Sequence, residues 1–365
     1  MLDDDGDLTL VVGRESGGPS TEFQVCANTM RRASPVWKRM LFGGYQESKP
    51  TVGEWTVTLL EDDPAALEVL LRIIHSKWTR DVVVVSDLES LYHLMIAINK
   101  YDLSEICRPW VQAWVSQARQ FAKAESPPGW HHIMWAYISW ETGDEQDFRR
   151  QVEAICMSAT VNEKDKLAIT IGDATVDLDE VNHIGPSNTI TILGEVRKLI
   201  IQDILDRVFN EMDGWASGKL KCTFQPQGSR YCKHCIRYFH RLEQYCSNCG
   251  HYGNPNVNVP DSELEPMCSF LIIGGVYQTQ HKLSLQRRCI DVKESITSLV
   301  ARLLGTLNEC VKPYKEHACA EWTISKLTDL GKVKEKLWKE MKAKDFPGPG
   351  HIKYMETQRQ KTSAL

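Results

Sequence analysis

Two stretches, Asp7-Leu8-Thr9-Leu10-Val11-Val12-Gly13 and Thr21-Glu22-Phe23-Gln24-Val25-Cys26, carry the pattern that decides the fold. The first alternates polar and apolar residues, as a strand with one buried face does. The Gly/Ser/Pro-rich residues between the two stretches predict a turn, and the second stretch predicts another strand. A third strand is expected over residues 55–60, where apolar and polar residues again alternate.

Helical patterns follow the second and third of these strands. Apolar residues spaced three or four apart predict helices over 26–41, 64–74 and 86–98, and another from Ser104. The third helix is expected to begin at Ser86, which forms a capping-box sequence with Glu89. Four consecutive valines, 82–85, predict a short buried strand before it. The N-terminal third therefore has the predicted order β-β-α-β-α-β-α-α, with the helices packed on a small sheet.

This order, together with four blocks of sequence, resembles the BTB/POZ domain. The blocks are Asp7–Gly13, Phe23–Met40, Phe42 with Glu47-Ser48, and Asn99-Lys100-Tyr101-Asp102-Leu103. One departure is Cys26, which stands where many members of the family have His. The resemblance covers residues 6–120 and implies a protein-interaction module that self-associates or binds the cullin scaffolds of ubiquitin ligases.

The resemblance also implies which residues take part in contacts between proteins. They lie on the first strand and the helix after the second: Asp7, Leu8, Cys26, Met30, Ser34, Trp37 and Met40. The chain is thus expected to be a homodimerising interaction scaffold and substrate adaptor of a cullin-type ubiquitin ligase. That helix also has a basic face, although a charge run of this kind is more often a solvated surface. It consists of Arg31, Arg32, Lys38 and Arg39.

A second region, 128–214, is predicted to be helical. The breaker cluster Ala124–Gly129 marks a domain boundary before it. Helices are expected over 131–140 and 147–159, with Gly143 ending the first and Asp144 capping the second. This aromatic-rich layout is similar to the region that follows the BTB domain in many filamentous-fungal proteins. A hairpin turning at Gly172-Asp173 and a long helix over 189–212 complete the region.

The third region, 215–345, is expected to hold a cysteine-rich segment followed by helices over 295–307 and 323–341. Cys232, Cys235, Cys246 and Cys249 form two C-x2-C pairs, a spacing typical of a structural zinc site with no open coordination position. The competing ligands are Cys222, His234, His240, His251, His317 and Cys319.

The same cysteine-rich segment is basic and aromatic. Contact with nucleic acid is therefore the alternative function, that of a transcription- or chromatin-associated factor. Residues 346–365 are expected to form a disordered tail.

The predicted fold class is α+β, from the pattern of strands and helices, and the composition is ordinary for an intracellular globular protein. The chain has 365 residues, a formal net charge of −5 and 42% hydrophobic residues, which is ordinary for a globular protein with sizeable cores. It contains no run apolar enough for a membrane span and no secretory signal pattern at Met1–Asp5. The 12 cysteines are then expected to be metal ligands or reduced thiols, in the nucleus or cytoplasm. No nucleophile–base set or phosphate loop is present in the N-terminal module, so an enzyme is not expected.

Overall fold

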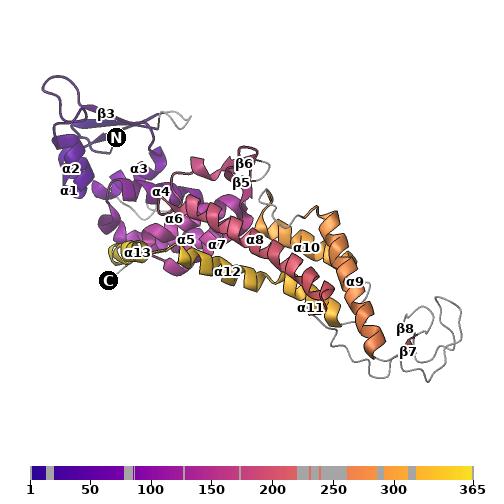
Figure 1. The fold of residues 1–365 in the computed structure, drawn as a ribbon. Coiled ribbons are helices and arrows are strands. Elements are labelled where there is room, and N and C mark those ends of the chain that lie inside the picture. The colour runs from indigo at the N-terminus through magenta and orange to yellow at the C-terminus, as the bar shows by residue number, and fades with distance from the viewer. Residues whose placement is uncertain are drawn as a thin grey trace. The chain divides into compact units, whose positions relative to one another are not determined.

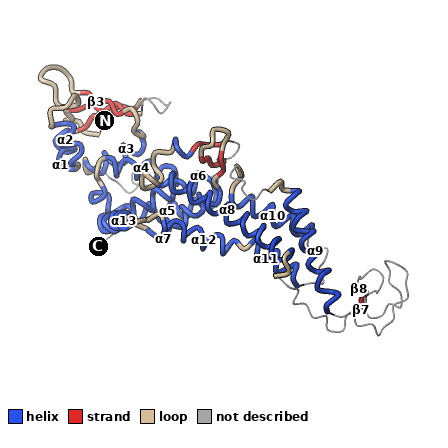
Figure 2. The backbone as a smooth tube through the Cα atoms, in the orientation of Figure 1, coloured by secondary structure: helices blue, strands red, loops and turns tan. Residues whose placement is uncertain are grey.

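The structure is a computed structural model. It describes residues 2–13, 20–77, 85, 87–125, 128–171, 174–219, 230–231, 238–239, 261–285, 292–310 and 318–363. These residues are mostly helical with small sheets, which confirms a mixed α+β class (Figure 2). The chain divides into two compact units, residues 1–194 with 341–365, and residues 195–340. Within the described residues, no helix is long and apolar enough to cross a membrane.

A three-stranded sheet begins the first unit. Its central strand is β1 (Leu8–Val12), which runs antiparallel to β2 (Thr21–Val25) and parallel to β3 (Thr56–Leu59). The inward-facing side chains of β1, those of Leu8, Leu10 and Val12, are fully buried. All three predicted strands are confirmed. The parallel pairing of β1 with β3 requires a crossover connection, and two helices provide it.

The crossover consists of α1 (Ala27–Ala33) and α2 (Pro35–Phe42), where a single helix was expected. Ser34 has an extended backbone, and its hydroxyl accepts a hydrogen bond from the Trp37 amide at 3.1 Å. Pro35 then occupies the first position of α2, where its missing N–H costs nothing. The prediction of one continuous helix is wrong because this Ser-Pro pair ends α1 and starts α2.

Five further helices continue the first unit: α3 (Pro64–Ile74), α4 (Leu88–Lys100), α5 (Ser104–Glu125), α6 (Pro128–Thr142) and α7 (Glu145–Ser158). Asp63 caps α3 and Asp87 caps α4, each accepting a backbone N–H at 2.7 Å. The cap of α4 therefore lies one residue after the predicted Ser86. The strand predicted at the four valines falls on residues 82–84, outside the described residues, while Val85 is buried.

Three other predictions for the first unit concern the break between α6 and α7, the hairpin and the domain boundary. Gly143 has φ +73° and Asp144 caps α7, which confirms the break between α6 and α7. The pairing predicted for the hairpin is confirmed, because β5 (Leu167–Ile171) runs antiparallel to β6 (Ala174–Asp177), and β4 (Thr160–Val161) adds a third strand. The predicted turn at Gly172-Asp173 lies outside the described residues. The boundary expected at 124–129 lies between α5 and α6, which belong to the same unit.

The C-terminal residues form α13 (Pro349–Thr362), which packs against α5 and α6 in the first unit (Figure 1). The Arg359 guanidinium donates two hydrogen bonds to the Gly143 carbonyl, at 2.8 and 3.1 Å. Arg108 Nε donates to the Lys361 carbonyl at 2.8 Å. The prediction of a disordered tail over 346–365 is therefore wrong for the described residues 346–363, because contacts with residues distant in the sequence order this polar segment.

The second unit is helical. It contains most of α8 (Thr189–Ala216), together with α9 (Asp261–Lys282), α10 (Ile296–Cys310), α11 (Ala318–Thr328) and most of α12 (Leu330–Ala343). Two short strands, β7 (Arg230–Tyr231) and β8 (Tyr238–Phe239), pair with each other. The long helix expected over 189–212 is confirmed, whereas the helix expected over 323–341 is two helices. Inside the unit, the buried Glu211 carboxylate pairs with the Lys326 ammonium and accepts from Trp215 Nε1.

Candidate interaction surface

Two of the sequence blocks that suggested the N-terminal module meet in its core. The rings of Trp37 and Tyr101 are 4.6 Å apart between centroids, and both side chains are buried. The Ser34 hydroxyl donates to the Tyr101 carbonyl at 2.6 Å while it caps α2. The block around Ser34 is thus fastened to the end of α4.

A buried carboxylate completes this junction. Tyr101 donates its hydroxyl proton to Asp62 Oδ2 at 2.7 Å, and Lys100 Nζ lies 3.0 Å from both Asp62 oxygens. Asp62 is only 5% exposed, so these charge-assisted bonds replace its hydration. Burial, with the Asp62 charge and hydrogen bond adding to it, raises the pKa of Tyr101 and keeps the hydroxyl a donor. The contacts of Asp62 with Lys100 and Tyr101 therefore stabilise the N-terminal module.

The structure separates the predicted interaction residues into two groups. The side chains of the first group form the core of the same chain and are not available to a partner: Leu8, Met30, Ser34 and Trp37. The second group reaches solvent. Asp7 is exposed, and Cys26 and Met40 are half-buried.

Asp7 and Cys26 lie together at the start of α1. Asp7 Oδ1 accepts from the Ala27 amide at 2.9 Å, and Lys49 Nζ lies 3.2 Å from Oδ2. Partial burial by itself would raise the pKa of this carboxyl, but these two partners lower it below its ordinary value. The Cys26 amide donates to His75 Nε2 at 3.0 Å, so Nδ1 carries the proton and donates to the Leu71 carbonyl. These hydrogen bonds of the His75 ring join the start of α1 to the end of α3.

An exposed apolar surface lies nearby, on α2 and the loop after it. Within the described part of the first unit, the most exposed large apolar side chains all fall between positions 36 and 60. Val36 and Phe42 are each 37% exposed, and Tyr45 is 58% exposed. A shallow groove of about 360 Å³ runs across this surface. Its lining residues are Pro35, Val36, Arg39, Met40, Tyr45 and Glu47.

Local geometry places these side chains. Trp37 and Leu41 point into the core, which leaves Val36, Arg39 and Met40 on the outer face of α2 at helical spacing. Gly44 has φ +81°, a conformation that favours glycine, and it lets the chain turn sharply after the helix. The loop is then held by Ser48, whose hydroxyl accepts from the Gly44 amide at 3.0 Å and donates to the Met40 carbonyl at 3.3 Å.

Sequence reasoning missed Val36, Tyr45 and Glu47 as surface residues. The sequence does contain a signal for Tyr45, which directly follows Gly43-Gly44 at the end of a predicted helix. A turn of this kind lies at the surface, so the side chain that follows it is expected to be exposed. Which face of the helix points outward depends on where the sheet lies, and that is a tertiary property.

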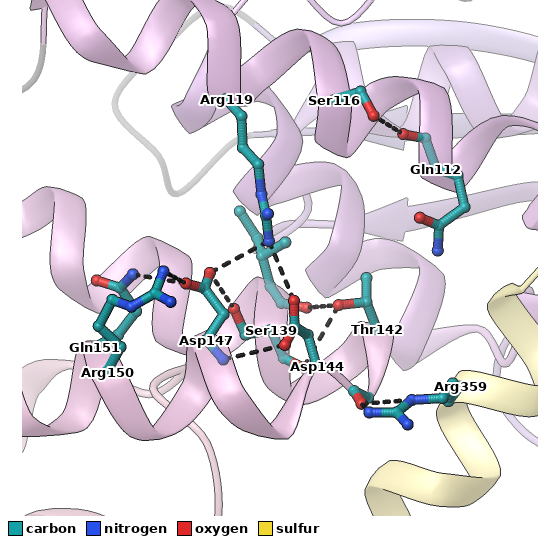
Figure 3. A network of polar contacts seen from close by, with 12 residues as sticks. Gln112, Ser116, Arg119, Ser139, Thr142, Asp144, Asp147, Arg150, Gln151 and Arg359 are labelled. Carbon is teal, nitrogen blue, oxygen red and sulfur yellow. Dashed lines mark hydrogen bonds and ion pairs between the residues drawn. The ribbon is translucent and has the colours of Figure 1, made fainter.

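A second polar cluster joins α5 to the turn between α6 and α7 (Figure 3). The Arg119 guanidinium lies 3.2 Å from Asp144 and 3.4 Å from Asp147, while the Ser139 hydroxyl donates to Asp147 at 3.0 Å. Arg150 pairs with the other Asp147 oxygen at 2.9 Å. Asp144 and Asp147 each accept from several donors, so the cluster stabilises the packing of α5 on the turn between α6 and α7.

The predicted metal ligands Cys232, Cys235, Cys246 and Cys249 lie outside the described residues, as do the competing Cys222, His234, His240, His251 and His317. Cys319 lies in α11, but its side chain is not described. Over the part of the chain that is described, no group of three or more His, Cys, Asp or Glu side chains could hold a metal ion. None of the four cysteines described in full takes part in a disulfide: Cys26, Cys107, Cys156 and Cys310.

Comparison of the sequence with protein-family models and with curated proteins finds no match.

Proposed function

We propose that the chain is a protein-interaction scaffold of the BTB/POZ type, acting as a homodimerising substrate adaptor of a cullin-type ubiquitin ligase. The observation that carries the proposal is the confinement of exposed large apolar side chains in the first unit to positions 36–60, among the described residues. Exposed apolar surface of this kind marks protein contacts. The element order of the N-terminal module, with α1 and α2 between β2 and β3, supports the resemblance on which the proposal rests.

Two parts of the module have separate roles in the proposal. Self-association uses the exposed region at the start of α1, where Asp7 and Cys26 reach solvent. The cullin scaffold uses the groove on α2, lined by Val36, Met40 and Tyr45. Residues that form the core, including Trp37 and Ser34, position these surfaces without touching a partner.

Two measurements on the full chain test this function. Light scattering is expected to give twice the 41.6 kDa mass of the chain, and a monomeric mass contradicts the homodimer. Affinity capture from cells is expected to recover a cullin. The double substitution Val36→Asp with Tyr45→Ala is expected to reduce that recovery about tenfold. Lys164→Glu, at an exposed position outside the groove, is the control and leaves recovery unchanged. Equal recovery with both variants contradicts the role of the groove.

A further inference from the structure

The groove on α2 has two walls that carry opposite charges. One wall is the outer face of α2, which contributes Arg39, and the other is the loop after the helix, which contributes Glu47. The apolar lining comes from both walls, through Val36 and Met40 on the helix and Tyr45 on the loop. The groove is therefore an apolar surface with a cation on its helix wall and a carboxylate on its loop wall.

Both charges are open to a ligand. Arg39 is exposed and Glu47 is half-buried. Among the described residues, their side chains form no ion pair with each other or with a third residue. Lys49, the nearest cation along the loop, instead pairs with Asp7 at 3.2 Å and lies over the Trp55 ring. A molecule that fills the groove thus meets one unpaired charge of each sign.

The two walls are also held in place by the rest of the fold. The Glu47 carbonyl accepts a hydrogen bond from Nε1 of the buried Trp55 at 2.9 Å, which fixes the loop wall to the core. The helix wall is fixed because Trp37 and Leu41, on the opposite face of α2, are fully buried. A site whose walls are already ordered loses less conformational entropy when a ligand binds.

We propose that this groove binds a short segment of a partner protein in which an apolar side chain is flanked by one acidic and one basic residue, the acidic residue facing Arg39 and the basic residue facing Glu47. The inference rests on the proposed function and specifies the chemistry of the partner at the same site. Complementary charges at the rim of an apolar contact contribute specificity more than affinity. Because the two charges lie on different walls, they favour one direction of the segment across the groove.

The size and the mixed charge of the groove favour such a segment over two other occupants. A groove of about 360 Å³ has the size of a pocket for a short ligand, whereas a stable dimer of whole chains buries a much wider surface. A nucleic acid carries negative charge along its whole length, and Glu47 would repel it. A short segment with one charge of each sign meets neither difficulty.

The test is selection of peptides from a random library displayed on phage, with the immobilised full chain as the target. The recovered peptides are expected to carry an acidic and a basic residue at fixed positions on either side of a large apolar residue. Selection against Arg39→Glu is expected to replace the acidic residue by Lys or Arg and to leave the basic position unchanged. Selection against Glu47→Lys is expected to do the reverse. The control Arg32→Glu reverses a cation of α1 that lines a different hollow, and it is expected to leave both positions unchanged.

Affinity measurements on one recovered peptide complete the test. Replacing its acidic residue by the corresponding amide is expected to weaken binding to the wild-type chain about three- to fivefold, as the loss of an exposed ion pair does. The same replacement is expected to have no effect on binding to Arg39→Gln, because the facing charge is already absent.

Several outcomes overturn the inference. They are recovery of no peptides, recovery of peptides without the two flanking charges, and unchanged affinity of the amide peptide for the wild-type chain. The last comparison uses no variant, so it decides the question even if a charge reversal disturbs folding. An Arg39→Glu chain that is monomeric in light scattering, and dimeric again when Glu47→Arg is added, assigns the groove to a second copy instead. A chain that dimerises and captures a cullin while failing this selection keeps the proposed function and loses only the inference.

Discussion

The junction between α6 and α13 is expected to weaken as pH rises through neutrality, because it encloses a carboxyl group. Glu141 is 4% exposed and is contacted by Tyr354, whose hydroxyl lies 2.9 Å from Oε2, and by the Asn99 amide at 2.8 Å. Burial raises the pKa of Glu141 to about 7, and the hydrogen bonds from Tyr354 and Asn99 offset only part of that effect. The carboxyl is therefore held protonated at a pH where the unfolded chain has released that proton.

The direction of the change in stability with pH follows from how many protons the folded and the unfolded chain bind. The folded chain holds more protons at Glu141 than the unfolded chain between the ordinary pKa of 4.5 and about 7. The stabilisation is then fully present below the lower value and is lost as pH rises through the upper one. The whole effect is about 3 kcal/mol, of which about 2 kcal/mol falls between about pH 5.5 and 8.

Hydrogen exchange of the α13 amides measures this local opening directly. Over that pH range, protection of α13 in the wild-type chain is expected to fall about 20- to 30-fold relative to a Glu141→Gln variant. Glutamine retains hydrogen-bonding atoms at the same position but does not titrate, so comparing the two proteins at each pH removes the intrinsic pH dependence of exchange. An equal change in both proteins would refute the reasoning.

Three further predictions concern the contacts of Asp62, the packing of α13 at Gly143 and the predicted zinc site. Asp62→Ala removes the acceptor of the buried Tyr101 hydroxyl and is expected to lower the free energy of unfolding in urea by about 2 to 4 kcal/mol. The control Asp63→Ala removes only the cap of α3 and is expected to cost about 1 kcal/mol. Equal losses of stability in the two variants would contradict a stabilising role for the contacts of Asp62. Gly143→Ala places a Cβ against the Met355 carbonyl and is expected to increase hydrogen exchange in α13. The control Gly44→Ala, also at positive φ but in open space, is expected to leave α13 protected. Similar protection in the two variants would show that α13 does not pack there. The spacing of Cys232, Cys235, Cys246 and Cys249 predicts that elemental analysis finds about one zinc ion per chain. The Cys235→Ser variant is expected to contain less zinc than the wild-type chain. Clearly less than one tightly bound ion in the wild-type chain would contradict the predicted zinc site.

The N-terminal module was readable from sequence because its signals are local. Alternation identified β1, β2 and β3, and the Asp-Pro sequence before α3 marked its start. The break at Ser34 was missed because apolar residues keep helical spacing on both sides of it. A Ser-Pro pair can be read as a cap, and here the cap outweighed the periodicity.

The C-terminal helix and the groove could not be read in the same way. α13 has few apolar residues, and its order depends on Glu141 and Gly143, which lie far away in the sequence. Trp37 and Ser34 were expected to contact a partner, but both are buried in the core, where they contact Tyr101 at the end of α4. Local patterns identify which side chains are apolar, whereas packing decides which of them remain exposed.

In the proposed function, the chain contacts its protein partners through the groove on α2. Site-specific incorporation of a photo-crosslinking amino acid at Val36, in the full chain inside cells, tests it most directly. We expect covalent adducts that mass spectrometry identifies as a few defined proteins, a cullin among them, and no such adducts from the same probe at Lys164. Absence of adducts at Val36, or the same set at both positions, would contradict it.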